Sequence, residues 1–281
     1  MSNIILSAFS DEYADSFQDQ LCGMQKHGFS YIEARFIDKK NVSTLSKDEV
    51  KTAKALLDAH GIGVSAIGSP LGKIRLDEDM NAHLETARRV FETANVFGAK
   101  YIRVFSFYAP EGKEITDMRD DVVEGLLKML AVAKEHGVTL CHENEAKIYG
   151  DVPSRVRELI DATDGALKCV FDMGNYVLEG VDPYPEAYEL LKKDIEYFHI
   201  KDALSAGAIV PPGKGEAKIR EILTAHSAYA KNDFFVTLEP HLECFSGLNA
   251  LVGRSFENPY KYENGQCAFD DAVLKFRELF A

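Results

Sequence analysis

Four short motifs place acidic and histidine side chains at the ends of apolar, strand-like runs. They are HENE, FDMGN, HIKD and LEPH, which begin at positions 142, 171, 199 and 238. These motifs contain three carboxylates and one imidazole, the side chains of Glu143, Asp172, His199 and Glu239. Oxygen-rich sets of this kind suit divalent cations of hard character, with Mn²⁺ expected first, Mg²⁺ next, and Co²⁺ or Zn²⁺ as alternatives through the histidine. The sequence therefore predicts one bound divalent metal ion.

Three further polar residues each follow one of these ligands by two positions. Because side chains alternate between the two faces of a strand, Glu145, Lys201 and His241 should face the same way as the ligand before them. We expect all three to bind substrate. Lys201 or His241 is also a candidate for proton transfer, because a bound cation makes a carboxylate a poorer base. A direct ion pair between Glu145 and Lys201 is the alternative.

Arg103 lies in an earlier strand-like run and is predicted to bind substrate, although an internal ion pair would explain it equally well. Glu33 and Arg35 share one face of another run and leave the same choice. Buried carboxylates without partners would cost several kcal/mol each. A cluster of them therefore favours a site that holds a cation over ordinary packing.

A repeating unit must position these residues. Amphipathic stretches such as 45–61 and 119–137 carry apolar residues at three- and four-residue intervals, which is typical of helices. They end at glycines spaced by roughly 35 residues, about the length of one strand, one helix and two loops. Gly28, Gly61, Gly98 and Gly137 suit the left-handed position after a helix. The histidines before three of them, His27, His60 and His136, are predicted to cap helix ends.

Eight strand-like runs alternate with these helices, and no Pro-, Ser- or charge-rich linker interrupts them. They cover residues 3–9, 31–37, 63–69, 101–107, 138–145, 166–173, 195–202 and 234–241. The pattern predicts an α/β fold, a (β/α)8 TIM barrel that forms a single domain over residues 1–281. An open doubly wound sheet is the alternative, but its GxGxxG signature is absent. Active sites of such barrels lie at the carboxyl ends of the strands, where the four motifs fall.

Composition limits the partners. The chain of 281 residues is 46% hydrophobic and carries a formal charge of -13, so it can bury a full core and repels phosphate backbones and anionic membranes. We expect a small sugar or polyol as substrate and no nucleic acid or membrane partner, and we leave homo-oligomerisation open. The five cysteines, Cys244 among them, show no CxxC spacing and are predicted to be reduced thiols. With no signal segment or membrane span, a cytoplasmic location is expected.

Together the four motifs resemble the xylose isomerase-like barrel superfamily, in particular its sugar isomerase and epimerase branch. The resemblance covers nearly the whole chain and implies that Glu143, Asp172, His199 and Glu239 bind the metal. It also implies that Glu143 and Glu239 exchange protons with a carbon next to a ketose carbonyl. A cation that touches both oxygens stabilises the enediolate that forms. A metal-dependent isomerase or epimerase of sugars or keto-sugars is therefore the predicted activity.

Two rivals share this frame. A lyase or dehydratase acting on a keto-inositol or 3-keto-glycoside would form the same enediolate and then expel a hydroxyl. A metal-dependent endonuclease of the same superfamily would need more histidines and a basic rim.

Secondary sites carry smaller expectations. The segment 205–219 is a candidate lid, and Lys214 within it could hold a phosphate, although Glu216 and the acidic chain favour an unphosphorylated substrate. Asn175 is expected either to shape the site or to cap a helix. His83 and His226, on predicted outer helices, are expected to face solvent.

Overall fold

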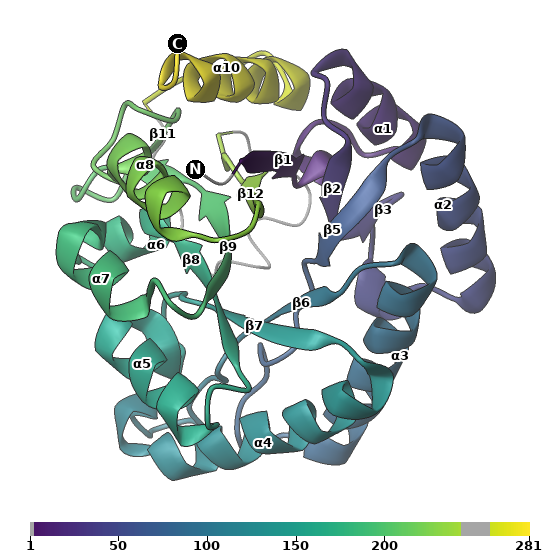
Figure 1. Cartoon of the computed structure of the whole chain (residues 1–281). Coiled ribbons are helices and arrows are strands. Elements are labelled where there is room, and N and C mark those ends of the chain that lie inside the picture. The colour runs from purple at the N-terminus through teal and green to yellow at the C-terminus, as the bar shows by residue number, and fades with distance from the viewer. Residues whose placement is uncertain (1–2, 243–258) are drawn as a thin grey trace.

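Eight parallel strands form the centre of the molecule, in the order β1-β12-β9-β8-β7-β6-β5-β2 (Figure 1). The computed structural model describes residues 3–242 and 259–281. The two ends of the order, β1 and β2, lie next to each other, so the barrel is nearly closed. All eight predicted strands are confirmed. They are β1 (Ile4–Ala8), β2 (Tyr31–Ala34), β5 (Gly63–Ile67), β6 (Tyr101–Val104), β7 (Thr139–Glu143), β8 (Lys168–Asp172), β9 (Ile195–Ile200) and β12 (Phe234–Leu238).

Helices surround the strands as an outer ring (Figure 1). They are α1 (Phe17–Lys26), α2 (Lys47–His60), α3 (Met80–Phe97), α4 (Arg119–His136), α5 (Pro153–Ala162), α6 (Met173–Leu178), α7 (Tyr188–Leu191), α8 (Ile219–Tyr229) and α10 (Gly265–Glu278). Local sequence sets their ends. The α2 helix begins with a capping box between Ser46 and Glu49. It ends at Gly61, whose φ of 64° is left-handed. All four repeat glycines were predicted to adopt this left-handed conformation, and each has a positive φ of 64° to 76°.

The histidines at the helix ends are structural, but only one of them bonds its own helix. Nδ1 of His136 lies 2.9 Å from the carbonyl oxygen of Val132, as a capping role requires. The side chain of His27 instead contacts Asp270 of α10, at 2.6 Å. That of His60 contacts side chains of α1. The side chains of His27 and His60 therefore fasten their helices to neighbouring helices, whereas that of His136 caps its own helix.

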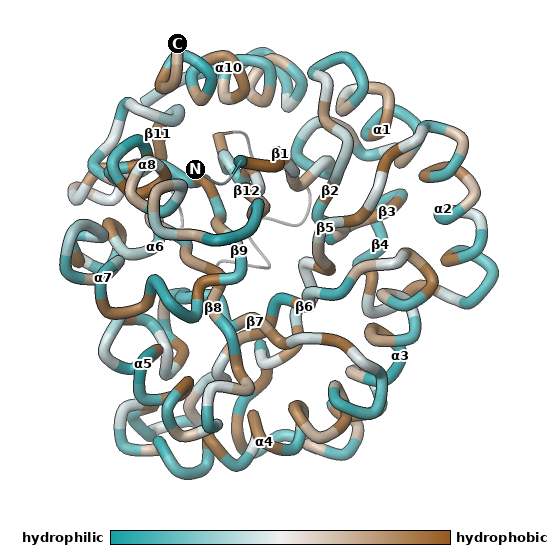
Figure 2. The backbone as a smooth tube through the Cα atoms, viewed as in Figure 1, coloured by the Kyte–Doolittle hydropathy of each residue, from teal (hydrophilic) through white to brown (hydrophobic). Residues whose placement is uncertain are grey.

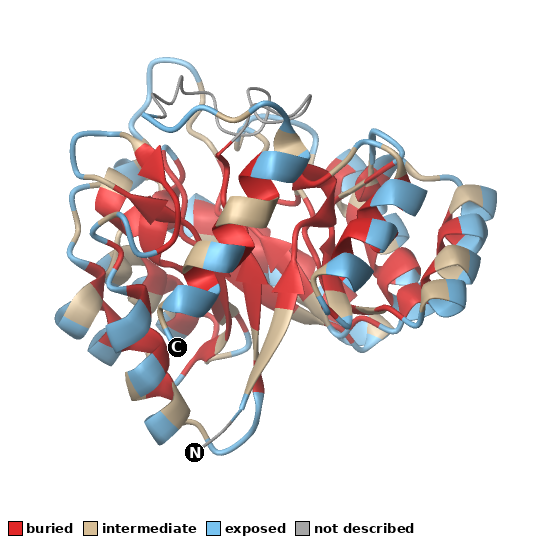
Figure 3. Ribbon diagram, turned by 90° about the horizontal axis from the view of Figure 1, so that it is seen from above, coloured by how far each residue is buried: buried red, intermediate tan, exposed pale blue. Residues whose placement is uncertain are grey.

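Two layers of apolar side chains fill the molecule, one between strands and helices and a smaller one inside the barrel. The outer layer includes Ile102, Leu140 and Phe171, and the inner one includes Cys141 and Tyr197. The tube in Figure 2 shows hydrophobic and hydrophilic residues interspersed along the helices, and Figure 3 shows that the buried faces turn towards the strands. The alternation of strand side chains therefore sends one set to the helices and the other to the interior.

Two histidines predicted to face solvent are buried instead. His83 accepts a hydrogen bond from the backbone N–H of Gly72 at 3.0 Å, and His226 packs against the rings of Phe198 and Phe234, with centroids 4.8 and 4.7 Å away. Both lie on the inner faces of α3 and α8. Their neutral rings are amphipathic enough to fill the layer between helix and strand.

The four described cysteines other than Cys244 are free, in agreement with the predicted thiols, and Cys244 lies outside the described residues. No helix in residues 3–242 and 259–281 combines the length and the apolar character that crossing a membrane requires.

Candidate metal centre

The structure brings the four predicted metal ligands together at the carboxyl end of the barrel. One ligand atom from each of Glu143, Asp172, His199 and Glu239 lies within 4.8 Å of the other three. Each residue is at most 2% exposed. Nδ1 of His199 lies 2.9 Å from Oε1 of Glu143 and 3.2 Å from Oε2 of Glu239. Four neighbouring strands, β7, β8, β9 and β12, therefore direct their last inward side chains at one point.

Asp172 is placed by the abrupt change from β8 to α6. Its Oδ1 accepts the backbone N–H of Asn175 at 2.8 Å and so caps the helix, while Oδ2 accepts from Nζ of Lys201 at 2.9 Å. The Asn144 side chain bonds the backbone N–H and carbonyl of Asp172. Gly174 makes the turn feasible, because a Cβ there would lie 2.6 Å from the backbone oxygen of Lys201. Asn175 also bonds Lys201, at 3.1 Å, so it shapes the site while Asp172 caps the helix.

Two buried cations each bridge two of the ligand carboxylates. Lys201, 3% exposed, lies 2.9 Å from Oδ2 of Asp172 and 3.2 Å from Oε2 of Glu239. Nη1 of Arg103 lies 3.3 Å from Oε2 of Glu143 and 3.7 Å from Oε1 of Glu239. Of the two roles left open for Arg103, the structure shows the internal ion pair.

Glu145 lies at the edge of this cluster and does not pair with Lys201. Its carboxylate faces Nζ of Lys73 at 3.4 Å and accepts the backbone N–H of Ala146. The predicted pair between Glu145 and Lys201 is therefore wrong. The chain turns away after β7, whereas Lys73 arrives from the loop after β5, a long-range partner that strand alternation cannot reveal.

A second charged group adjoins the ligands and was largely missed by the sequence analysis. The Arg35 guanidinium, 1% exposed, bonds Asp11 and Glu239 at 2.9 Å each and Glu12 at 3.3 Å. His241 lies 3.3 Å from Glu239 and 3.5 Å from Glu12. Glu12, Glu239 and His241 also form a geometric metal triad. Arg35 already supplies the positive charge there, so we assign no second ion to it. The available signal was SDE directly after the first strand.

Burial and neighbouring charges shift the pKa values of the three ligand carboxylates differently. Burial raises the pKa of Glu143, but His199 and Arg103 outweigh it and bring the pKa to about 2. Burial acts on Glu239 in the same direction, and Lys201, followed by the two histidines, holds its pKa well below the ordinary value. Burial raises the pKa of Asp172 to about 7 against the opposing charge of Lys201. Both glutamates are therefore ionised near neutral pH.

The two candidate bases, Lys201 and His241, have pKa values shifted in opposite directions. Burial lowers the pKa of Lys201, but Asp172 and the glutamates reverse this and raise the pKa above its ordinary value. Burial, assisted by the charge of Lys201, lowers the pKa of His241 to about 3. Lys201 therefore stays charged and His241 stays neutral over the physiological range.

The donor set fits a divalent cation. Carboxylates outnumber the lysine and arginine cations around the mouth even when Glu12, whose pKa burial raises to about 8, is left out. A group of like charges in a buried site needs compensation. The described carboxylates are Asp11, Glu12, Glu33, Glu143, Glu145, Asp172 and Glu239, and the described cations are Arg35, Lys73, Arg103 and Lys201. Three oxygens and one nitrogen at mutual ligand distance suit Mn²⁺ or Mg²⁺.

The predicted lid, residues 205–219, is anchored beside the site. Asp202 and Ala203 form β10 (Asp202–Ala203), which pairs with β11 (Ile209–Val210). The Asp202 carboxylate accepts backbone N–H groups of Gly213, Gly215 and Ala217 at 2.7 to 3.1 Å. These amides would otherwise suit an anion. Because Asp202 already occupies them, the segment offers no phosphate site of the kind considered for Lys214.

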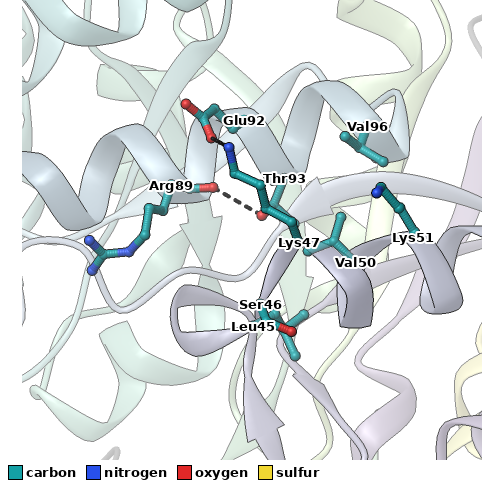
Figure 4. A pocket seen from close by; sticks show the side chains of 9 residues that line it. All are labelled: Leu45, Ser46, Lys47, Val50, Lys51, Arg89, Glu92, Thr93 and Val96. Carbon is teal, nitrogen blue, oxygen red and sulfur yellow. Dashed lines mark hydrogen bonds and ion pairs between the residues drawn. The ribbon is translucent and has the colours of Figure 1, made fainter.

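A hollow of about 370 Å³ lies between α2 and α3 in the helix layer (Figure 4). Apolar side chains, Leu45, Val50 and Val96, combine there with exposed charges such as Lys47 and Glu92, which pair at 4.0 Å. None of the proposed ligands lines it. It is therefore separate from the candidate metal centre.

A family model described as xylose isomerase-like TIM barrel matches residues 24–243. The chain therefore belongs to the xylose isomerase-like TIM barrel family, which confirms the resemblance drawn from the four motifs. No curated protein matches the chain.

Solved structures of the same fold align along the full chain at low identity. A probable 3-DHS dehydratase, AsbF, from Bacillus anthracis has 19% identity and a TM-score of 0.73, covering 100% of this chain and 99% of its own. D-allulose 3-epimerase from Methylomonas sp., in complex with D-allulose, has 14% identity, a TM-score of 0.74 and coverages of 99% and 97%. A xylose isomerase-like barrel protein from Mycobacterium smegmatis, in complex with magnesium, has 16% identity, a TM-score of 0.69 and coverages of 99% and 97%.

Proposed function

We propose that this member of the xylose isomerase-like TIM barrel family is a divalent-metal-dependent isomerase or epimerase of ketoses or keto-sugars. The observation that carries the proposal is the convergence of Glu143, Asp172, His199 and Glu239 within 4.8 Å, buried at the carboxyl end of the barrel. These four residues would hold the ion. When bound, a divalent cation would offset the negative charge that develops on the two substrate oxygens of an enediolate.

The residues of the chain would move the proton. Glu143 and Glu239 come from β7 and β12, with β8 and β9 between them, so they approach the mouth from different directions. Either carboxylate could accept the proton next to a carbonyl and the other could return one. Lys201, permanently charged, would stabilise a developing oxyanion. Of Lys201 and His241, only the neutral His241 has a lone pair that can accept a proton.

We further propose a substrate without carboxylate or phosphate. In the part of the chain that the structure describes, each cation at the mouth already contacts a carboxylate: Arg35, Lys73, Arg103 and Lys201. Asp202 occupies the amides that would suit a phosphate. The likeness to an epimerase in complex with D-allulose is consistent with a neutral sugar.

A lyase or dehydratase is the second candidate, favoured by the likeness to the probable 3-DHS dehydratase over the full chain. Such an enzyme would remove the same proton and then expel a hydroxyl. The two activities differ only after the enediolate forms.

Incubation of the Mn²⁺-loaded protein with ketoses, an inosose and 3-keto-glycosides in heavy water tests both. Deuterium at one carbon without loss of water supports the isomerase or epimerase. An absorbing enone supports the lyase, and no exchange with any compound contradicts both.

Glu239→Gln should abolish exchange, because it removes the charge that accepts a proton and keeps the shape of the side chain. Glu92→Gln is the matched control, since Glu92 lines the hollow between α2 and α3, away from the proposed ligands. Exchange at the full rate in Glu239→Gln would remove Glu239 from the proton pathway.

A further inference from the structure

We infer that Glu33 is a positioning residue, which fixes the ring of His199 so that Nδ1 faces the proposed cation. The inference rests on the proposed function, because it concerns a ligand of the ion named there. It assigns a role to a residue whose type alone indicated either an ion pair or a sugar contact.

The contacts around the imidazole define its orientation. Oε2 of Glu33 lies 2.9 Å from Nε2 of His199, and both side chains are 0% exposed. We assign a proton to Nε2, which then donates a hydrogen bond to Oε2 of Glu33, because carboxylate oxygens act as acceptors. The other nitrogen, Nδ1, then turns towards Glu143 and Glu239. A carboxylate behind a ligating histidine is the usual means of fixing its tautomer and ring plane.

Glu33 is itself held in place. Its second oxygen, Oε1, accepts the hydroxyl proton of Tyr197 at 3.1 Å. Tyr197 also packs edge-on against the His199 ring, with centroids 5.5 Å apart, and Phe9 does so from another direction at 5.1 Å. These contacts therefore hold the Glu33 carboxylate in place and leave the His199 ring little room to rotate.

Two irregularities in strand register lie beside these side chains. In the pairing of β2 with β5, Ile32 lies opposite Val64 and Glu33 opposite Ala66, so Ser65 is an extra residue. The Ser65 hydroxyl bonds the backbone oxygen of Ile32 at 3.1 Å. Bulges of this kind re-aim side chains near active sites.

The second irregularity lies on β9, the strand that carries the histidine. Cys169 pairs with Ile195 and Val170 with Tyr197, so Glu196 is the extra residue. Cys169 packs in the layer between strands and helices, and Val170 packs inside the barrel beside Tyr197. A shift of one residue reverses the face of every following side chain. The bulge therefore sets both Tyr197 and His199 inwards, the two groups that Glu33 contacts.

The experiment measures Co²⁺ and Mn²⁺ binding by titration calorimetry and the visible spectrum of bound Co²⁺, in the full chain and in Glu33→Ala and Glu33→Gln. We expect Glu33→Ala to weaken metal affinity about 10- to 100-fold and to change the Co²⁺ spectrum. Glu33→Gln keeps an acceptor oxygen and should restore most of the affinity. Glu92→Ala is the control, because Glu92 lines the hollow between α2 and α3, away from the proposed ligands, and its metal affinity should stay near that of the wild type.

A second measurement stands without metal and also serves if Glu33→Ala fails to fold. In protein labelled with ¹⁵N-histidine, the Nε2–H of His199 should give a slowly exchanging imidazole signal that is altered in Glu33→Gln and unchanged in Glu92→Ala. A folded Glu33→Ala that binds Co²⁺ with unchanged affinity and spectrum overturns the inference. Absence of binding by the wild type would instead contradict the proposed function.

Discussion

The two halves of the barrel contribute different chemistry to the same mouth. The C-terminal strands β7, β8, β9 and β12 supply the proposed ligands, each next to the end of its own strand. The N-terminal half supplies groups that contact and orient these ligands. Glu33 lies on β2, Arg35 directly follows β2, and Arg103 lies on β6. One half would hold the ion, and the other keeps its ligands charged and aimed.

This difference explains how a folded core can contain a cluster of buried carboxylates. Arg35 and Arg103 both contact Oε1 of Glu239, at 2.9 and 3.7 Å, and Arg103 also contacts Glu143. Breaking a buried ion pair from one side leaves an uncompensated charge. The C-terminal half therefore depends on the N-terminal half for its stability, while the chemistry depends on the C-terminal half.

The largest expected effect separates the halves by activity. Glu143→Gln should reduce deuterium exchange into a substrate by about 10²- to 10⁴-fold, the range for losing a general acid or base. Asp11→Asn, which alters a partner of Arg35 in the other half, should cost tenfold at most on this scale. The exchange rate of each purified variant in heavy water checks this. An equal loss in Asp11→Asn would show that both halves take part in proton transfer.

The next effect separates the halves by stability. Arg35→Met should lower the free energy of unfolding by about 3 to 5 kcal/mol, because Asp11, Glu12 and Glu239 lose a shared buried partner. Urea unfolding of the metal-free protein measures it. Arg35→Lys keeps the charge but not the planar fork and should lose less. A fully stable Arg35→Met would mean that the carboxylates do not need this cation.

A smaller effect concerns pH and two buried histidines of the helix layer, His83 in the N-terminal half and His226 in the C-terminal half. Burial lowers the pKa of His226 from 6.5 to about 4, and it lowers that of His83 as well. The unfolded chain therefore binds more protons between these values, so stability should fall as the pH drops from 6.5 towards 4. His226→Phe should reduce this loss, as measured by urea unfolding at pH 7 and pH 5. An unchanged pH dependence would contradict the assignment.

The smallest effect is expected away from both sets of charges. Lys47 and Glu92 pair at 4.0 Å across the hollow between α2 and α3, with side chains 89% and 55% exposed. Lys47→Ser should change the free energy of unfolding by no more than about 0.5 kcal/mol, because solvent screens such a pair. Metal affinity should stay the same. A loss of metal affinity in this variant would connect the hollow to the mouth.

The sequence predicted the strand count, the helix ends and the four converging ligands because each depends on local pattern. Strand alternation and the left-handed glycines need only a few neighbouring residues. The partners of those ligands could not be read in this way. Arg35 lies 204 positions from Glu239, and Glu33 lies 166 from His199.

Strand register is another feature that local pattern did not predict. The bulges at Ser65 and Glu196 insert single residues that no hydrophobic pattern marks. The failed pair between Glu145 and Lys201 has a related cause, since the chain leaves the strand direction after Glu143 and Lys73 arrives from another loop. His83 and His226 were misplaced because polar residue type outweighed helix face in the prediction.

Mn²⁺ binding to the metal-free chain, followed by the paramagnetic resonance signal of free Mn²⁺, tests the central claim most directly. We expect one ion per chain, with binding lost in Asp172→Ala and His199→Ala and retained in Lys47→Ser. A wild-type protein that leaves all added Mn²⁺ free, and binds no Mg²⁺, Co²⁺ or Zn²⁺ in its place, would contradict it.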